Sequence, residues 1–477
     1  MFGKVIPAPS LRPAYNMGFP WDIPTGRYYK GIYGEMLLNG GILTFTGIGG
    51  QGNLGKSLAA HEFNVTMIDR YAMLDPAEAK ARSLVYDTEP PSVNPGRFQG
   101  LVRKRERLAE MDVESVMMFT DSTVMTGNKF FKAFRDGIKE TLDDKKPELV
   151  EYPFLDKKTG KFLTNYLPHV VEIDSLSMLQ AEVVDRILDE NEIGESGANI
   201  EAMKGQAAKT QMLVQMPDLC ASANVCCIST AHVGKVYQLD PRAPLSKSLA
   251  FLKADVKFKR VPENFGFLTT HLWYLITGTP LKNRTTGAPE FPRSSEDNLE
   301  GDTDLMRVTF MLVRSKNGPS GHVVDVIVSQ SEGILSHLTA LVYLKDNDGY
   351  GIGGNDRNYF LDILPDVKLS RTTVRGKIDA DAKLRRALEI TGEMCQMRNF
   401  WHDLPEGWLC TPKELYDDLK AKGYDWDQLL DTRGWWTWNG AKGVKNYLST
   451  GDLLNMRAGL YHPFWMAEKP KALAVTE

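Results

Sequence analysis

Eight consecutive residues in the N-terminal part of the chain match a phosphate-binding pattern. Residues 50–57 satisfy GxxxxGK[ST] without a mismatch. In such a loop the glycines let backbone N–H groups point at phosphate oxygens, the lysine reaches the β- and γ-phosphates, and the final hydroxyl faces Mg²⁺. Ser57 is therefore an expected Mg²⁺ ligand. The expected ATP-binding residues are Gly50, Gln51, Gly52, Asn53, Leu54, Gly55, Lys56 and Ser57.

Nucleotide hydrolysis also needs an acid for Mg²⁺ and a group that orients the attacking water. Asp174 ends an apolar run, and the carboxyl ends of parallel strands open onto the ligand crevice, so we expect Asp174 to hold the metal. Two carboxylates are candidates for the water. Glu89 follows the apolar run 83–87, whereas Glu172 shares the strand face of Asp174. A carboxylate inside a strand needs a partner, so we expect Glu172 to face a sheet edge or a cation, and we favour Glu89.

The surrounding chain alternates buried-strand patterns with helical ones, which is typical of a parallel sheet covered by helices. We therefore expect an α/β fold with a mostly parallel central sheet. The expected strands are 42–46, 82–87, 114–119, 170–174, 225–230, 271–277, 306–314 and 321–328. The expected helices are 56–72, 97–110, 128–144 and 197–222.

Composition changes along the chain indicate three parts. Residues 1–30 are rich in proline, glycine and aromatic residues and are expected to form an arm that contacts a neighbouring protomer. Residues 31–345 carry the α/β pattern. Residues 346–477 contain most of the tryptophans and are expected to be a separate mixed α/β region of unknown role. Within the core, 145–167 is a polar insertion with a hairpin turn at 156–160, and 281–303 is expected to be a surface loop.

The bulk composition excludes several classes of protein. The 477 residues carry a formal net charge of −4, so any nucleic-acid surface must be local. We find no apolar run near the ~20 residues of a membrane span, and no apolar N-terminal core of a signal peptide. The five cysteines form no CxxC pair, which favours core packing and a reducing compartment. We therefore expect a cytoplasmic protein, in the bacterial host if the gene belongs to a phage.

The order of these motifs resembles the RecA family of recombinases. The likeness is carried by residues 50–57, 86–89 and 171–175. Residues 227–232 also resemble the strand that ends in the family's γ-phosphate sensor, and 310–316 with 321–326 resemble its paired late strands. The pattern covers roughly residues 20–345 and is most like the UvsX branch found in phages. The insertion 145–167 and the loop 281–303 are longer than the family pattern implies, and the tryptophan-rich region matches no part of it.

This resemblance implies a RecA-like P-loop ATPase core and assigns roles to further residues. It implies that Glu89 activates the water and that His232 senses the γ-phosphate. It also implies that Arg314 and Lys316 reach the nucleotide of a neighbouring subunit, although bacterial RecA has a lysine in place of Arg314. The family stacks a residue on adenine just after the catalytic glutamate. Here the candidates for that contact are Arg97 and Phe98.

In this family the loops after the strands of Asp174 and His232 contact single-stranded DNA. The first of these, about 180–206, is acidic and poorly suited to phosphate. The second interleaves cations with aromatic residues, which suits a strand whose bases stack on rings. Tyr237 is the aromatic residue we favour. The alternative is a solvated basic loop with its aromatic residues in the core. The expected DNA-binding residues are Lys235, Tyr237, Arg242, Lys247, Lys253, Lys257, Lys259 and Arg260.

The sequence thus predicts an ATP-dependent DNA recombinase that polymerises on single-stranded DNA and promotes pairing and strand exchange with a duplex. Its expected partners are DNA, further copies of itself in a helical filament, and a single-strand-binding protein or loader. One alternative is a ring-forming helicase or other DNA motor on the same core. Another is an accessory protein with a degenerate site, against which the intact Lys56, Asp174 and Glu89 argue.

Overall fold

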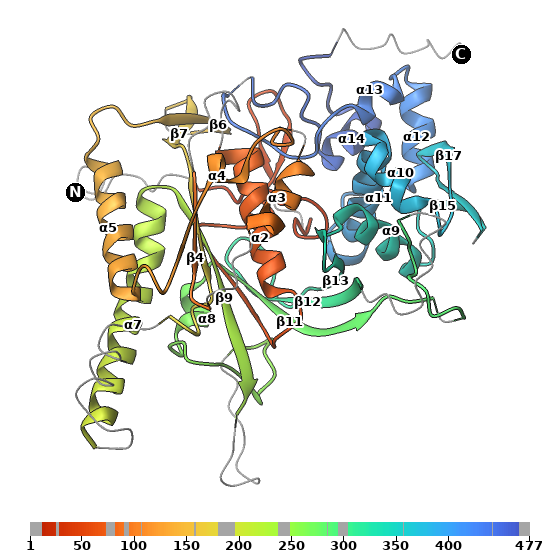
Figure 1. The fold of residues 1–477 in the computed structure, drawn as a ribbon. Coiled ribbons are helices and arrows are strands. Elements are labelled where there is room, and N and C mark those ends of the chain that lie inside the picture. The colour runs from red at the N-terminus through yellow and green to blue at the C-terminus, as the bar shows by residue number, and fades with distance from the viewer. Residues whose placement is uncertain are drawn as a thin grey trace.

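The computed structural model describes residues 12–24, 28–72, 82–89, 95–105, 107–156, 159–179, 196–236, 249–283, 285–293, 304–355, 357–440 and 442–466. For residues 196–206 it describes the backbone alone. A large α/β layer and a smaller, mainly helical region lie side by side (Figure 1). Within the described residues, no helix combines the length and apolar composition needed to cross a bilayer.

A ten-stranded sheet forms the centre of the described chain, in the order β14-β13-β12-β11-β3-β9-β8-β4-β5, with β10 paired to β9. From β11 to β5, all neighbouring strands run parallel, whereas β12, β13 and β14 alternate in direction. The strands are β3 (Phe45–Gly50), β4 (Ser83–Asp87), β5 (Met117–Asp121), β8 (His169–Asp174), β9 (Val225–Lys235), β10 (Val256–Phe258), β11 (His271–Pro280), β12 (Leu305–Ser315), β13 (Val323–Ser329) and β14 (Gly333–Ile334).

All eight expected strands are present, and the mostly parallel sheet confirms the α/β class. Several strand boundaries differ from the sequence prediction by a few residues. β3 continues to Gly50 through a glycine-rich stretch. Glycine suits these positions because side chains of neighbouring elements fill the space that a Cβ would occupy. A Cβ at Gly49, for example, would come within 2.3 Å of the Phe258 ring. The start of the expected strand 114–119 is instead a helical turn, α4 (Val113–Val116).

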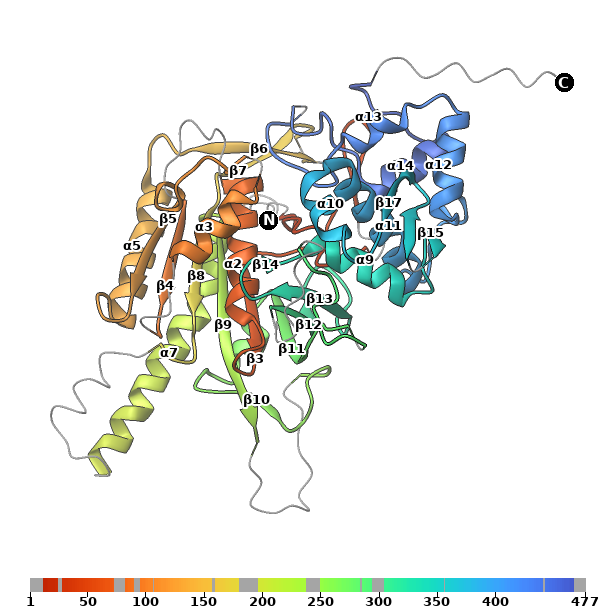
Figure 2. The same ribbon diagram turned by 45° about the vertical axis from the view of Figure 1, so that its right-hand side comes forward.

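Helices cover both faces of the sheet, as expected (Figures 1 and 2). Side chains of α2 (Lys56–Met67) and α3 (Pro95–Arg103) share one core cluster with Val85, whereas those of α5 (Gly127–Asp143) and α7 (Ser196–Ser222) share another with its neighbour Tyr86. Adjacent strand residues point to opposite faces, which is why the two clusters divide there. The polar insertion forms the predicted hairpin, β6 (Leu149–Leu155) and β7 (Phe162–Tyr166).

The C-terminal region has its own hydrophobic core around two packed helices, α9 (Ser336–Asp346) and α11 (Ala382–Phe400). It also contains a three-stranded sheet. The sheet is β15 (Ile352–Asn355), β16 (Asn358–Leu361) and β17 (Leu364–Leu369), and the remaining helices are α10 (Val374–Ala380), η3 (Glu406–Trp408), α12 (Pro412–Ala421), α13 (Trp426–Leu430) and α14 (Thr450–Arg457).

The C-terminal region is nevertheless less separate than the sequence predicts. Trp436 and Trp438 lie in the core of the α/β layer, where Trp436 packs against Tyr15 and Tyr71 with ring centroids 5.9 and 5.0 Å apart. The burial of these large rings stabilises the joint between the two parts of the chain.

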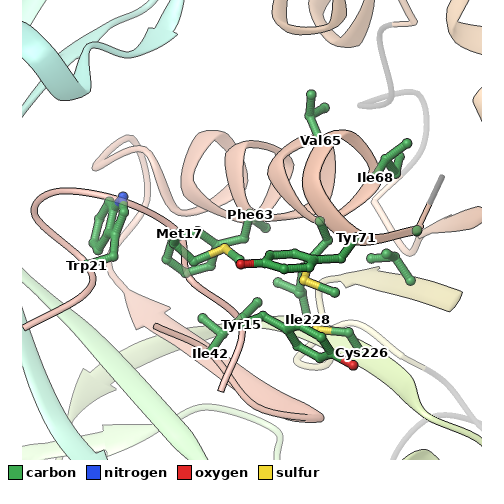
Figure 3. Close-up of a cluster of buried hydrophobic side chains, with 14 of the residues drawn as sticks. Tyr15, Met17, Trp21, Ile42, Phe63, Val65, Ile68, Tyr71, Cys226 and Ile228 are labelled. Carbon is green, nitrogen blue, oxygen red and sulfur yellow. The ribbon is translucent and has the colours of Figure 1, made fainter. Parts of the chain in front are cut away.

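The described part of the expected N-terminal arm also packs into this core. Tyr15, Met17 and Trp21 are buried beside Phe63 of α2 and Tyr71 of the π-helical turn η1 (Ile68–Ala72), as Figure 3 shows. A two-stranded hairpin, β1 (Tyr28–Lys30) and β2 (Met36–Leu38), follows. Residues 13–24 are thus mostly buried within their own protomer. Residues 1–11 lie outside the described chain, and a contact of the arm with a neighbour stays a prediction.

Glu393, on α11, makes stability depend on pH. Its carboxylate accepts a hydrogen bond from Thr450 (2.5 Å), and burial raises its pKa to about 7 despite the nearby charge of Arg386. The unfolded chain releases this proton near its ordinary pKa of about 4.3, so the residue lowers the free energy of unfolding as the pH rises from about 4 to 7. We expect Glu393→Gln to remove that loss, worth on the order of 1–3 kcal/mol at pH 8.

Denaturant unfolding at pH 5 and pH 8 measures this difference. The exposed Glu406, close by in sequence, offers a matched control, and Glu406→Gln is expected to keep the wild-type pH dependence. Equal pH slopes for wild type and Glu393→Gln would contradict the assignment.

Candidate nucleotide site and basic surface

The phosphate loop connects the end of β3 to the first turn of α2. Asn53 and Gly55 adopt positive φ values of 60° and 86°, a left-handed conformation that glycine adopts without strain. Gly55 is the N-cap of α2, whose first turn carries no acidic residue, so the positive end of the helix faces the loop. This arrangement suits a bound polyanion.

Lys56 is held over this loop. Its side chain is buried, and its ammonium donates a hydrogen bond to the carbonyl oxygen of Gln51 (2.8 Å). Burial lowers its pKa, and the carboxylates of Asp174 and Glu89 oppose that shift only in part. An added phosphate would favour the charged form, because it supplies the counter-charge that the buried ammonium lacks.

The parallel sheet brings the expected acids to the same edge. Asp87 pairs in register with Asp174, and Gly50 pairs with His232, so the ends of β4, β8, β9 and β3 meet beside the loop. Asp174 accepts a hydrogen bond from the Thr230 hydroxyl on β9. This contact orients the carboxylate.

Glu89 and His232 form a pair at this edge. The imidazole Nε2 lies 2.6 Å from a Glu89 oxygen, which also accepts a hydrogen bond from the Ser175 hydroxyl (2.8 Å). Burial by itself would raise the pKa of Glu89, but the hydrogen bonds from His232 and Ser175 and the charge of Lys56 lower it overall. Glu89 is therefore an ionised acceptor at neutral pH. Its side chain is 38% exposed, so water can reach it.

Glu172, the other candidate for orienting water, is fully buried. Its two oxygens are bonded to His61 Nδ1 (2.5 Å) and Asn64 Nδ2 (2.8 Å), both on α2. The carboxylate thus faces the helix beside the phosphate loop and not a sheet edge. Since solvent does not reach it, Glu89 is the carboxylate that can orient a water.

A cavity of about 590 Å³ joins the phosphate loop to the basic surface. It is lined by Gln51 and Gly52 on one side and by Glu89 and His232 at the sheet edge. The cations around it are Lys235, Lys259 and Arg260. A ligand in this cavity would therefore contact both the Glu89–His232 pair and the cations.

The basic residues in the described part of this segment are exposed, and β10 pairs the segment with the end of β9. Lys253, Lys257, Lys259 and Arg260 are all exposed, as is Lys235 at the end of β9. Tyr237, Arg242 and Lys247 lie outside the described residues. Phe258 packs against Phe265 (centroids 5.4 Å apart) and over Gly49, so this ring belongs to the core and does not face a polynucleotide.

The two candidates for adenine stacking differ in exposure. Phe98 is fully buried on α3, with its ring 4.0 Å from that of His61, so the expectation that it stacks on adenine is wrong. Its apolar ring follows the helical periodicity into the core. Arg97 is exposed and stays a prediction.

Arg314 and Lys316 do not reach the phosphate loop of their own chain. Arg314 on β12 pairs with Leu272 on β11, which in turn pairs with Gly47 on β3. The backbone N–H of Lys316 donates to the carbonyl of Thr270, which lies beside Phe45 at the start of β3. Arg314 Nε donates to the carbonyl of Thr269 (3.0 Å), and Lys316 is exposed. Both cations are therefore at the sheet end opposite the loop, where a role on another subunit's nucleotide stays a prediction.

Sequence reasoning missed three hydroxyl-bearing partners: Thr230, Ser175 and Ser177. Each lies within three residues of Asp174 or His232, but their contacts are made to segments distant in the sequence and have no local signature.

The donor set is compatible with Mg²⁺. Within the described residues no cluster of three histidine, cysteine or carboxylate side chains could hold a metal. Mg²⁺ in nucleotide sites binds one or two protein ligands together with phosphate oxygens and water, so Ser57 and Asp174 would be sufficient.

Comparison with known proteins gives no further assignment: no family model matches the chain, and no curated protein sequence matches it.

Proposed function

We propose that this protein is an ATP-dependent DNA recombinase with a RecA-like core, which assembles on single-stranded DNA. The observation that carries the proposal is the cavity in which the phosphate loop, the Glu89–His232 pair and the cations Lys259 and Arg260 meet. Hydrolytic residues that share a cavity with backbone-binding cations fit an ATPase whose activity depends on a polynucleotide.

The strand order supports the same proposal. β9 lies between β3, which leads into the phosphate loop, and β8, which carries Asp174. His232 on β9 pairs with Gly50 and therefore stands between the loop and the acids. A sensor of the γ-phosphate must occupy such a position, because it has to contact both the phosphate and the segment that follows.

In the proposed reaction, the loop amides and Lys56 bind the phosphates of ATP, and Ser57 and Asp174 hold Mg²⁺. The metal, when bound, neutralises charge on the phosphate oxygens. Glu89 accepts a hydrogen bond from the attacking water and orients it for in-line attack on the γ-phosphorus.

His232 switches partner in this scheme. One imidazole N–H can donate to Glu89 or to a γ-phosphate oxygen, but not fully to both. With ATP bound, the phosphate is the stronger acceptor, so Glu89 is released to bind water. Arg314 and Lys316 of an adjacent protomer would neutralise charge on the γ-phosphate, as trans-acting cations do in other NTPases.

Two measurements test the proposal together. ATP hydrolysis is expected to rise when single-stranded DNA is added, and electron microscopy with ATP and DNA is expected to show helical filaments. Closed rings would instead favour the motor-protein alternative. No affinity for ATP at millimolar concentration with Mg²⁺ would overturn the nucleotide site itself.

The basic segment makes a separate prediction. Replacing Lys253, Lys257 and Lys259 together by alanine is expected to weaken binding to single-stranded DNA. The slope of log K against log salt is negative, and each lost phosphate contact should reduce its magnitude by about 0.7, so the triple variant should have a slope shallower by ~2. Salt titrations of a labelled oligonucleotide measure it.

A control with the same change in charge comes from α12. Lys413 and Lys420 on α12 and Lys422 just beyond it are exposed, and their triple replacement is expected to leave the slope unchanged. A wild-type slope in the Lys253/Lys257/Lys259 variant would mean that this segment does not contact the DNA.

A further inference from the structure

The described ends of two segments, 175–179 after β8 and 256–260 at β10, are tied to each other by side chains that the proposed hydrolysis does not use. Ser177 makes the first tie. Its buried hydroxyl donates to the carbonyl oxygen of Lys259 and accepts from the backbone N–H of His232, each at 2.8 Å. Ser177 thereby connects the segment after β8 to the backbone of the proposed sensor.

Lys209, on α7, makes the second tie. Its ammonium donates to the carbonyl oxygen of Arg260 (2.6 Å) and to that of Leu179 (3.3 Å). The first carbonyl belongs to the β10 segment and the second to the β8 segment, so one side chain holds both. With 6% of its surface exposed, Lys209 is shielded from competing water.

The position of Lys209 is unfavourable for the fold alone. Burial, and secondly the positive charge of Arg260, lower the pKa of Lys209 to about 8. Among the described residues, its ammonium bonds to carbonyl oxygens and forms no ion pair with a carboxylate. Arg260 itself adopts a positive φ of 53°, a conformation that non-glycine residues rarely take. Such features persist where surrounding contacts enforce them, and they concentrate at functional sites.

The ties continue into the nucleotide site without a break. Glu89 contacts the side chain of His232, the backbone of His232 bonds to Ser177, and Ser177 bonds to Lys259. The next residue, Arg260, is bonded through its carbonyl to Lys209. A displacement of His232 therefore acts on both segments and on α7 through direct hydrogen bonds.

We propose that Ser177 and Lys209 form a clamp, acting as positioning residues, that makes the β8 and β10 segments move as one unit and transmits the state of His232 to the polynucleotide-binding surface. The inference rests on the proposed function, because it requires that nucleotide and DNA affinities are linked. If the two segments are held together, a displacement of His232 moves both of them as one. If they moved independently, the displacement would act on each of them separately.

The test is a measurement of that linkage. The affinity for a fluorescein-labelled oligothymidine is measured without nucleotide and with a slowly hydrolysed ATP analogue. Couplings between sites commonly lie in the range of about 5–150-fold, and the wild type is expected to fall within it. Lys209→Met is expected to reduce the enhancement to within about twofold of none, while the affinity for the analogue alone stays within about twofold of wild type.

A matched control and a second variant keep the result interpretable. Lys422→Met, at an exposed lysine just beyond α12, is expected to retain the full enhancement. Ser177→Ala removes a single hydroxyl and should reduce the enhancement in the same direction. If Lys209→Met does not fold, as judged by its thermal transition, Ser177→Ala decides.

The possible failures are distinguishable. A wild-type protein whose DNA affinity ignores the analogue would overturn the proposed function, and the clamp with it. A normal wild-type enhancement that persists in both variants would overturn the clamp alone.

Discussion

Replacing Lys56 by alanine is expected to lower the rate of ATP hydrolysis by about 10²–10³-fold or more, because the variant loses the ammonium that stabilises charge on the transferring phosphoryl group. The structure makes this loss hard to compensate. Lys56 is buried over the loop and held by the Gln51 carbonyl, so its charge is pre-positioned where phosphate would lie. The phosphate affinity should fall as well.

Steady-state hydrolysis and binding of a fluorescent ATP analogue measure the two effects. Lys139, exposed on α5, provides a control in which a lysine is removed away from the loop, and Lys139→Ala should hydrolyse ATP normally. Normal hydrolysis by Lys56→Ala would show that residues 50–57 are not the catalytic site.

Glu89→Gln is expected to separate binding from chemistry. The amide keeps the size of the side chain but accepts hydrogen bonds less strongly, so a positioned water is no longer activated. We expect turnover to fall by about 10²–10⁴-fold with ATP affinity nearly unchanged. Since the hydrogen bonds from His232 and Ser175 lower the pKa of Glu89 overall, this carboxylate should stay ionised, and its contribution to the rate should be constant, from pH 6 upward.

Glu172→Gln is the comparison that discriminates between the two carboxylates. Glu172 is buried against His61 and Asn64, so its replacement should lower the melting temperature and leave turnover per folded molecule largely intact. The reverse result, with Glu89→Gln active and Glu172→Gln inactive, would assign the water to Glu172.

Much of the fold follows from local patterns. Strand runs, helical periodicity and the 156–160 turn are properties of short segments, and all eight expected strands and four expected helices are present. The boundary errors have a local cause too. Glycine carries no strand signal, so the sequence could not show that Gly47 to Gly50 continue β3 beneath the side chains of other strands.

Contacts between distant residues were less predictable. The arm and the tryptophan-rich region look like peripheral additions by composition, yet Tyr15 and Trp436 meet in one core. By sequence, Phe98 could face either a ligand or the interior, and only the placement of α3 shows that it is buried. In each case, an aromatic side chain is equally suited to two environments, and burial settles which one it occupies.

Residue order alone was enough for the phosphate loop, for the acid at the end of β8 and for the alternation that builds a parallel sheet, because each depends on spacing within a few residues. Packing was needed to show that Glu172 is buried while Glu89 stays open to solvent, to bring His232 within 2.6 Å of Glu89, and to set Lys209 between two carbonyls from separate segments. Those groups are 30 to 143 positions apart in the chain. Their contacts form only when the strands align in the folded sheet, so no local sequence pattern predicts them.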